Sequence, residues 1–361
     1  LGLVCTSNNR FSRKLDMHGD KLSYCAGEIW RALDVEFFEG VHAYIRQHAQ
    51  PLKPSQPRPH QQRAVKNAYR HLIKEGNSRG KLIMPCGTGK SLAGYWISQK
   101  LESKKILIAV PSLALIRQTL EVWARESVSN NIDINWIVVC GDESVVVADR
   151  DDISVLTKDL GIKIHTDPDE VSKWLKTQQD QIMVVFTTYQ SGEATAAASR
   201  KAKVSFDLGV VDEAHKTTGK SDSLFSHLLF DENIEIKKRI FMTATERRYK
   251  GDSDEIISMD DPEVYGDTFE FLSFKEALEI DPPILCDYKV VTIFVSRSEV
   301  ASLIDQNIFV KPDKGKWNDV LEAEMLSALV ALRKSLKDHP IKKSVSFHSS
   351  ISRAKAFKTN Q

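Results

Sequence analysis

The sequence has few cysteines, no long apolar run and almost no net charge. Its five cysteines are widely separated and form no Cys-x-x-Cys pair, so neither a disulfide framework nor a cysteine metal site is indicated. The longest apolar runs fall far below the roughly 20 residues that span a bilayer. With 50 basic and 49 acidic residues, no overall field draws the chain to nucleic acid or to an anionic membrane. We therefore expect a reducing, cytoplasmic setting without membrane contact, and only local contact with nucleic acid.

Length and proline content predict more than one domain. A chain of 361 residues with 42% hydrophobic side chains can bury one large core and part of another. Residues 51–59 contain four prolines, which preclude a helix there and favour an extended linker. The linker separates residues 1–50 from the body. That first segment has a helical apolar pattern over residues 28–48 but is too small for a core of its own.

Helices alternate with short β-rich runs after the linker. A helix is predicted over residues 62–74 and another over residues 113–125. The β-rich runs cover residues 81–84, 105–110, 134–139, 182–186, 208–211 and 240–242. Continuous apolar strands joined by helical crossovers predict a parallel sheet with helices on both faces. Ligand chemistry is then expected at the carboxyl ends of the strands.

A glycine loop follows the first of these strands. Residues 84–91 read MPCGTGKS, in which Gly87 and Gly89 permit close approach of the backbone to phosphate. The amides of the loop, that of Thr88 included, would hold a nucleotide, with Lys90 contacting its β- and γ-phosphates and the Ser91 hydroxyl binding Mg²⁺. The alternative is a tight turn with an incidental lysine.

Two adjacent carboxylates, Asp212 and Glu213, end a later strand. By themselves they would form an ordinary polar turn. Downstream of a glycine loop, they favour a site in which Asp212 binds Mg²⁺ and Glu213 polarises the attacking water. His215 lies too far along the chain to bind the same ion by simple spacing, so we interpret it as a coupling residue. Together these segments predict an ATP-hydrolysing site with the catalytic residues Lys90, Glu213 and His215.

The chain resembles the first motor lobe of the superfamily 2 helicases and translocases of DEAH-box type. The resemblance is greatest to the branch with the motor subunits of type I and type III restriction systems. Besides the loop and the carboxylates, it depends on four motifs in the family's order: RPHQ at residues 58–61, VPSLALIRQ at 110–118, TTYQS at 187–191 and MTAT at 242–245. The family commonly has proline after the last motif, where this chain has Glu246.

The resemblance assigns roles to residues outside the loop and the carboxylate pair. It implies that Gln61 recognises adenine and that Ser112 and Thr188 contact a nucleic-acid backbone. Thr243 and Thr245 would link the ATP site to strand binding. The two predicted backbone contacts have structural alternatives, since Ser112 could merely cap a helix and Thr188 could be an ordinary hydroxyl at a strand end.

The resemblance also implies a division into domains. Residues 60–290 would form a RecA-like ATP-binding domain of the α/β class, and residues 291–361 a linker and the start of a truncated second RecA-like domain, opening with a strand at 344–349. Residues 1–50 would be a small helical segment, which the resemblance connects with the tail of an upstream nuclease-like domain. The family's arginine finger belongs to the second lobe. We therefore expect residues 1–361 to bind ATP and Mg²⁺ but to hydrolyse ATP weakly.

The predicted function is an ATP-dependent helicase or translocase, DNA-directed and related to restriction or defence, with nuclease or modification domains in the full-length protein. The alternative is a nucleotide-gated interaction module that switches partners without moving along a strand. A small-molecule kinase is disfavoured, because the carboxylate pair and MTAT follow the glycine loop in order.

Overall fold

The computed structural model describes residues 2–5, 22–25, 34–45, 52–140, 164–177, 181–220, 225–249, 256–296, 298, 320–348, 350, 354–355 and 357–358. Contacts within the chain define two compact units, Leu1–Cys286 and Asp287–Gln361. Each unit is treated separately below.

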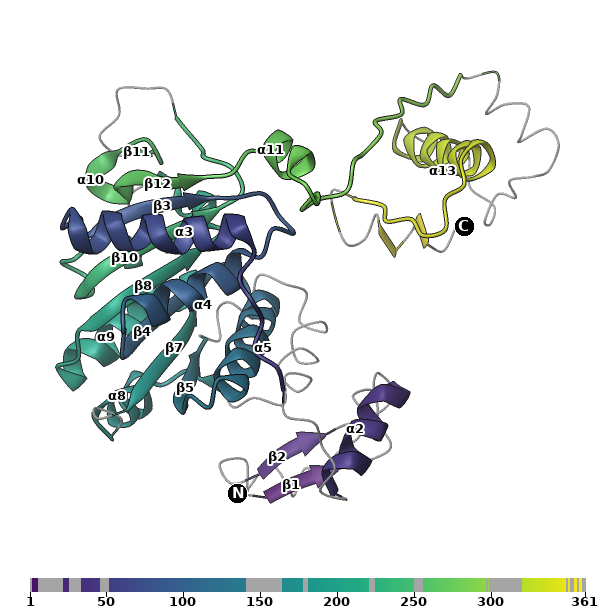
Figure 1. Cartoon of the computed structure of the whole chain (residues 1–361). Coiled ribbons are helices and arrows are strands. Elements are labelled where there is room, and N and C mark those ends of the chain that lie inside the picture. Colours follow the sequence, from purple (N-terminus) through teal and green to yellow (C-terminus); the bar gives the residue numbers. More distant parts are fainter. Residues whose placement is uncertain are drawn as a thin grey trace. The chain divides into compact units, whose positions relative to one another are not determined.

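A single parallel sheet forms the centre of the first unit. Over the described residues it has eight strands in the order β12-β3-β10-β8-β4-β7-β5-β6, and every neighbouring pair is parallel (Figure 1). In chain order the strands are β3 (Arg79–Ile83), β4 (Lys105–Val110), β5 (Ile134–Val139), β6 (Ile164–His165), β7 (Ile182–Thr188), β8 (Phe206–Asp212), β10 (Ile236–Thr243) and β12 (Asp267–Phe271).

All six predicted strands lie in this sheet, and the two that the sequence pattern misses are its edges. The edge strand β6 has only two residues, too few for a periodic pattern. The other edge, β12, reads DTFEF, with a burial pattern that leaves three of its five residues exposed. Edge strands of this kind lack the continuous apolar run by which the buried strands are recognised.

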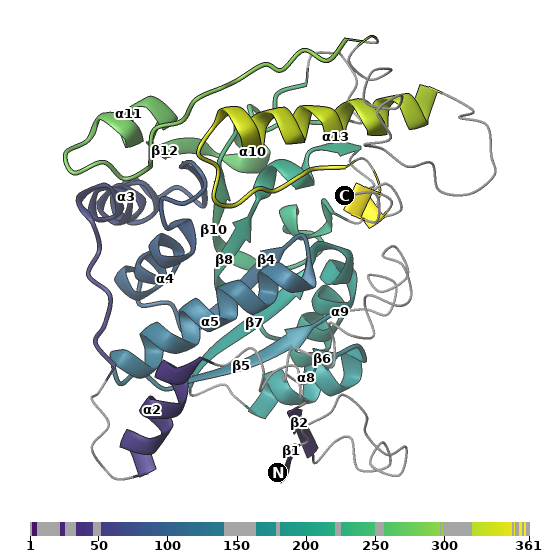
Figure 2. The same ribbon diagram turned by 90° about the vertical axis from the view of Figure 1, so that its right-hand side faces the viewer.

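Helices cover both faces of the sheet, as predicted. One face carries α3 (Pro59–Tyr69), α4 (Lys90–Lys100) and α5 (Leu113–Ser129), and the other carries α8 (Pro168–Thr177) and α9 (Gly192–Ala202) (Figures 1 and 2). Helix α3 begins at Pro59, before the predicted start, because proline is well tolerated at the first helical position. It continues into a π-helical turn over Arg70–Lys74.

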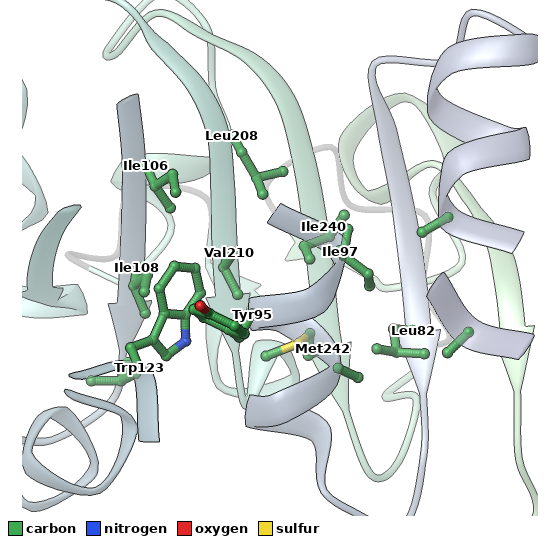
Figure 3. Packing of buried hydrophobic residues seen from close by; sticks show 14 of the residues in the cluster. Leu82, Tyr95, Ile97, Ile106, Ile108, Trp123, Leu208, Val210, Ile240 and Met242 are labelled. Atoms are coloured by element: carbon green, nitrogen blue, oxygen red, sulfur yellow. The ribbon is translucent and has the colours of Figure 1, made fainter. Parts of the chain in front are cut away.

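An inner strand such as β4 is apolar along its length because its successive side chains point to opposite faces of the sheet and both faces are buried. In β4, Ile106 and Ile108 belong to the cluster under α3, α4 and α5, whereas Leu107 and Ala109 belong to the cluster under α8 and α9. In the first cluster Tyr95 of α4 meets Trp123 of α5 edge to face, with ring centroids 5.3 Å apart (Figure 3). This packing fixes α4, whose first turn follows the glycine loop.

Smaller elements complete the first unit. The strands β9 (Gly219–Lys220) and β11 (Ile256–Ile257) pair antiparallel, and the short helices are α10 (Pro262–Tyr265) and α11 (Phe274–Glu279). Near the N-terminus, β1 (Gly2–Cys5) pairs parallel with β2 (Leu22–Cys25), and α2 (Val35–Ile45) lies within the helix predicted for residues 28–48. Asp34, directly before α2, is not helical, and residues 28–33 and 46–48 of that predicted helix are outside the described residues.

The main element described in the second unit is α13 (Val320–Asp338). The strand predicted for residues 344–349 is not formed over the described residues 344–348, which have no regular structure. A strand requires a neighbour to complete its backbone hydrogen bonds, and the described part of this unit contains no other strand. In the part of the chain that the structure describes, no helix is long and apolar enough to cross a membrane.

We predict that Trp123→Ala destabilises the first unit by about 3–5 kcal/mol, because it opens a cavity between α4, α5 and the sheet. Trp123 is 1% exposed, whereas Trp136 on β5 is 36% exposed and serves as the matched control. Urea unfolding should show a clearly smaller loss for Trp136→Ala, about 1 kcal/mol. Equal losses for the two variants would contradict this account of the core.

Candidate functional site

The sheet order brings three motif-bearing segments to one edge. Strands β3, β10 and β8 are consecutive neighbours, and their parallel pairing puts their carboxyl ends at the same edge. The glycine loop follows β3, the carboxylate pair ends β8, and the MTAT motif ends β10. Segments far apart in sequence thus meet where ligand chemistry is expected in a parallel sheet.

The glycine loop has the backbone conformation that only glycine adopts without strain. Gly87 and Gly89 have φ values of 85° and 82°, in the left-handed region. Thr88 closes the turn, since its hydroxyl donates to the Pro85 carbonyl oxygen at 2.7 Å. Helix α4 begins at Lys90, directly after Gly89. The loop amides and the positive end of the helix dipole therefore lie together, an arrangement suited to an anion.

Two side chains from the start of α3 hold the loop. The Gln61 amide nitrogen donates to the carbonyl oxygens of Thr88 and Gly89 at 3.2 and 3.4 Å. The His60 ring nitrogen Nε2 lies 3.0 Å from the same Thr88 oxygen. Recognition of adenine by Gln61 stays a prediction, and the structure adds a contact with the phosphate loop itself. His60 was not singled out from the sequence, although it precedes Gln61 in the RPHQ motif.

Lys90 and Ser91 lie in the first turn of α4. The Lys90 side chain is largely buried, and its ammonium donates to the Met84 carbonyl oxygen at 3.3 Å, inside the curve of the loop. The Ser91 side chain is half-buried. A cation held by its own loop is well placed for phosphate, because the weak contact with a neutral carbonyl can be exchanged for a charge-assisted one.

In the carboxylate pair Asp212 is buried, Glu213 is partly exposed, and the two charges repel each other. Asp212 is 8% exposed, and burial together with the charge of Glu213 raises the pKa of its carboxyl to about 6, although Lys90 acts in the opposite direction. Its Oδ1 atom accepts a hydrogen bond from the Glu213 amide at 2.9 Å. Glu213 has a φ of 53°, a left-handed conformation that is costly for a residue with a side chain. Strain of this kind is typical of functional sites.

His215 connects the carboxylates with the end of β10. Its Nδ1 atom lies 3.4 Å from Glu213 Oε2 and 3.1 Å from Thr243 Oγ1. The Thr243 hydroxyl donates to the Thr245 carbonyl oxygen at 2.8 Å. The Met84 amide donates to the Thr243 carbonyl oxygen at 2.9 Å, which ties the glycine loop to the same strand end. The residues predicted to couple the site therefore form one continuous network.

The two predicted nucleic-acid contacts differ in exposure. Ser112 is exposed at the start of α5, where its side chain makes no capping hydrogen bond. Thr188 is 1% exposed, and its hydroxyl lies 2.9 Å from that of Ser191. Both lie at carboxyl ends of neighbouring strands, β4 and β7. Direct contact of either residue with a strand stays a prediction.

The oxygen groups of the site fit Mg²⁺. Among the described residues no three His, Cys, Asp or Glu side chains form a cluster that could hold a metal by themselves. Mg²⁺ does not require such a cluster, because it retains waters and binds through one or two protein oxygens together with phosphates. The raised pKa of the Asp212 carboxyl shows that its neighbours do not fully stabilise the charge, so this carboxylate is suited to a cation. Binding of Mg²⁺ by Asp212 and by the Ser91 hydroxyl stays a prediction.

The departure at Glu246 from the family's usual proline has a structural explanation. Its carboxylate accepts from the Lys81 ammonium at 2.6 Å and from Arg248. Lys81, in β3, is 6% exposed and also donates to the Met259 carbonyl oxygen at 2.7 Å. An ion pair therefore ties the segment after β10 to the strand that leads into the glycine loop.

The parallel sheet, the glycine loop after β3 and the carboxylates ending β8 define a RecA-like P-loop lobe of the superfamily 2 helicase type. A family model described as "Type III restriction enzyme, res subunit" matches residues 54–248, more than half of the chain. The chain belongs to this family.

Similar proteins agree with this assignment. Probable helicases of African swine fever virus are 28–29% identical over 221 residues, which is 61% of this chain and 22% of theirs. The ATP-dependent Type ISP restriction-modification enzyme LlaBIII, solved bound to DNA, superposes with a TM-score of 0.69 at 24% identity, over 97% of this chain and 23% of that chain. The Type ISP enzyme LlaGI, solved in complex with a DNA substrate mimic, superposes with a TM-score of 0.51 at 33% identity, over 64% of this chain and 18% of that chain. The chain thus spans about a fifth to a quarter of the length of these relatives.

Asp212 provides a test of the site's electrostatics in the metal-free protein. Between about pH 4 and pH 6 the folded state binds a proton that the unfolded state has released, so the free energy of unfolding falls as pH rises through this window. A pKa moved from 3.8 to about 6 corresponds to about 3 kcal/mol. In urea unfolding with EDTA, we expect Asp212→Asn to be up to about 3 kcal/mol more stable than wild type at pH 8, with the gain shrinking toward pH 4.

Asp207 is a control of opposite sign. Burial opposes ionisation of its carboxyl, but Lys237 and the amides of Lys104 and Lys105 outweigh it and lower the pKa. The stability that the ionised Asp207 carboxyl contributes is fully present above its pKa in the unfolded state. It is lost as pH falls through its lower pKa in the folded state. Asp207→Asn should therefore destabilise the protein at pH 8. A destabilising Asp212→Asn would contradict the account of the buried carboxylate.

Proposed function

We propose that this chain is the ATP-binding lobe of a nucleic-acid motor, a helicase or translocase that acts on DNA in restriction or a related defence. The observation that carries the proposal is the meeting of the glycine loop, Asp212–Glu213 and the His215–Thr243 contact at one edge of the sheet. This site combines a cradle for phosphate, oxygen ligands for Mg²⁺ and a path from the carboxylates to a neighbouring strand end.

Each site residue has a part in the proposed cycle. Lys90 and the loop amides bind the phosphates, and Ser91 and Asp212 hold Mg²⁺, which when bound neutralises charge on the phosphate oxygens. A Glu213 carboxylate oxygen accepts a hydrogen bond from the attacking water and orients it. Burial lowers the pKa of His215, so its neutral ring can exchange hydrogen bonds between Glu213 and Thr243 as the nucleotide changes.

DNA is the proposed partner because two solved relatives are restriction-modification enzymes described as bound to DNA or to a DNA mimic. Exposed hydroxyls such as Ser112 are suited to phosphate contacts that carry no sequence information. We propose that the full-length protein carries further nuclease or modification domains. For residues 1–361 by themselves we keep the expectation of weak hydrolysis.

The alternative, a nucleotide-gated interaction module, differs in what stimulates hydrolysis. Duplex DNA should raise the ATPase rate of the full-length motor. Stimulation by a protein partner alone would favour the interaction module.

We predict that Lys90→Ala weakens ATP binding about 10- to 100-fold, because a charge-assisted contact with the phosphates is lost. Isothermal titration calorimetry with Mg²⁺ and ATP measures the change. Lys100→Ala, at the other end of α4, is the control and should bind as wild type, since Lys100 is exposed and lies over the Tyr69 ring. Equal affinity of wild type and Lys90→Ala would remove the loop from nucleotide binding.

We predict that Glu213→Gln retains ATP binding but lowers kcat about 10²- to 10⁴-fold, because the amide cannot act on the attacking water as a base. Steady-state ATPase of the full-length protein measures kcat and KM separately. Exposed Glu235→Gln is the control for a carboxylate-to-amide change and should leave both values unchanged. Unchanged turnover in Glu213→Gln would assign the water to another residue.

A further inference from the structure

Tyr189 makes a contact that the proposed cycle does not yet use. It follows β7 directly and begins a short 3-10 turn over Tyr189–Ser191. Its hydroxyl donates a hydrogen bond to the main-chain carbonyl oxygen of Asp212, at the end of β8. The side chain is completely buried. A residue of the TTYQS motif thus touches the backbone of the carboxylate pair.

This contact joins two strands that are not neighbours. Strand β4 lies between β7 and β8 in the sheet. Adjacent strands are about 4.8 Å apart, so the ends of β7 and β8 are separated by roughly 10 Å, and no backbone ladder can join them. The register aligns the three ends, because Val110 pairs with Thr188 on one side and Ala109 pairs with Val211 on the other. The phenol spans the end of β4.

The surroundings of Tyr189 keep its hydroxyl a donor. The ring belongs to the apolar cluster with Ala109 and Val211, and it meets Phe225 at a centroid distance of 5.6 Å. Burial, and after it the negative charge of Asp212, raises the pKa of the phenol well above 10. The hydroxyl therefore stays protonated. Its hydrogen bond to the Asp212 carbonyl oxygen breaks only if one of the two groups moves.

The oxygen that accepts the Tyr189 hydrogen bond belongs to the peptide group that joins Asp212 to Glu213. The orientation of this peptide group is linked to the left-handed φ of 53° at Glu213. Along the chain, Tyr189 directly follows Thr188, which is a predicted nucleic-acid contact. A shift of the chain after β7 would therefore reach the peptide that orients Glu213 through one rigid side chain.

We propose that Tyr189 is a positioning residue that couples nucleic-acid binding at the end of β7 to the orientation of the Asp212–Glu213 peptide. The inference depends on the proposed function, since it needs a motor whose hydrolysis is stimulated by a nucleic acid. Nucleic acid moves the chain after β7, Tyr189 carries this movement across β4, and the peptide turns Glu213 toward the attacking water.

The test is Tyr189→Phe in the full-length protein, a change that removes one oxygen atom and keeps the apolar packing. ATPase is measured without DNA and with saturating linear duplex DNA, each over a range of Mg²⁺-ATP. We expect the ratio of DNA-stimulated to basal kcat to fall about fivefold or more, the usual scale of coupling between sites. The KM for ATP should be retained, because Tyr189 does not contact the glycine loop.

Tyr265→Phe is the matched control. Tyr265 is also completely buried in the same apolar cluster, but its hydroxyl bonds the Thr217 side-chain hydroxyl at 2.8 Å, in the turn Ala214–Thr217, instead of the Asp212–Glu213 peptide. The Tyr265→Phe variant should lower the melting temperature by about as much as Tyr189→Phe. It should keep the wild-type ratio of DNA-stimulated to basal kcat. An equal loss of stimulation in both variants, in line with their melting temperatures, would make Tyr189 merely structural and overturn the inference.

The remaining outcomes separate the two proposals. If wild type is stimulated by DNA and Tyr189→Phe is stimulated to the same extent, the inference alone is wrong. If wild type itself shows no stimulation by DNA, the proposed function is wrong and the inference fails with it.

Discussion

Parallel pairing of β3, β10 and β8 is the constraint on which the rest of the site depends. It brings the glycine loop, the carboxylate pair and the MTAT motif to one edge although more than a hundred residues separate the first two. The bond from the Met84 amide to the Thr243 carbonyl extends this pairing beyond the end of β3. The helices on both faces keep the pairing in place, because β8 and β10 contribute side chains to both apolar clusters and β3 contributes to the cluster under α3, α4 and α5.

The site contains groups that are unfavourable in the ligand-free protein. Asp212 is a buried carboxylate beside a second carboxylate, Lys90 is a buried ammonium whose contact is a neutral carbonyl, and Glu213 has a strained backbone. The buried Asp212 carboxylate and the strained Glu213 backbone each lower the stability of the ligand-free protein. Under the proposed function, a divalent cation with phosphate would stabilise the charge of Asp212. The Lys81–Glu246 pair stabilises the neighbouring segment at the same time, so the strain stays local.

Much of the fold could be predicted because its signals are local. The strands at residues 105–110 and 134–139 were predicted with the observed bounds, since buried parallel strands are continuous apolar runs. The edge strands β6 and β12 were missed, because edges do not have this pattern. Residues of the glycine loop and the carboxylate pair were singled out by residue type and spacing, whereas His60, Lys81 and Tyr189 contact partners distant in sequence.

The sequence by itself determined the class of the protein. Glycines where a left-handed turn was needed, a lysine and hydroxyl after them, and two carboxylates after an apolar run are chemical requirements visible in the order of residues. Only the tertiary structure decided how these groups interact: that Gln61 contacts the loop, that Thr188 faces inward and that Tyr189 reaches Asp212 across β4. Such contacts depend on strand order and register, which are properties of the whole sheet, because no local stretch encodes which strands become neighbours.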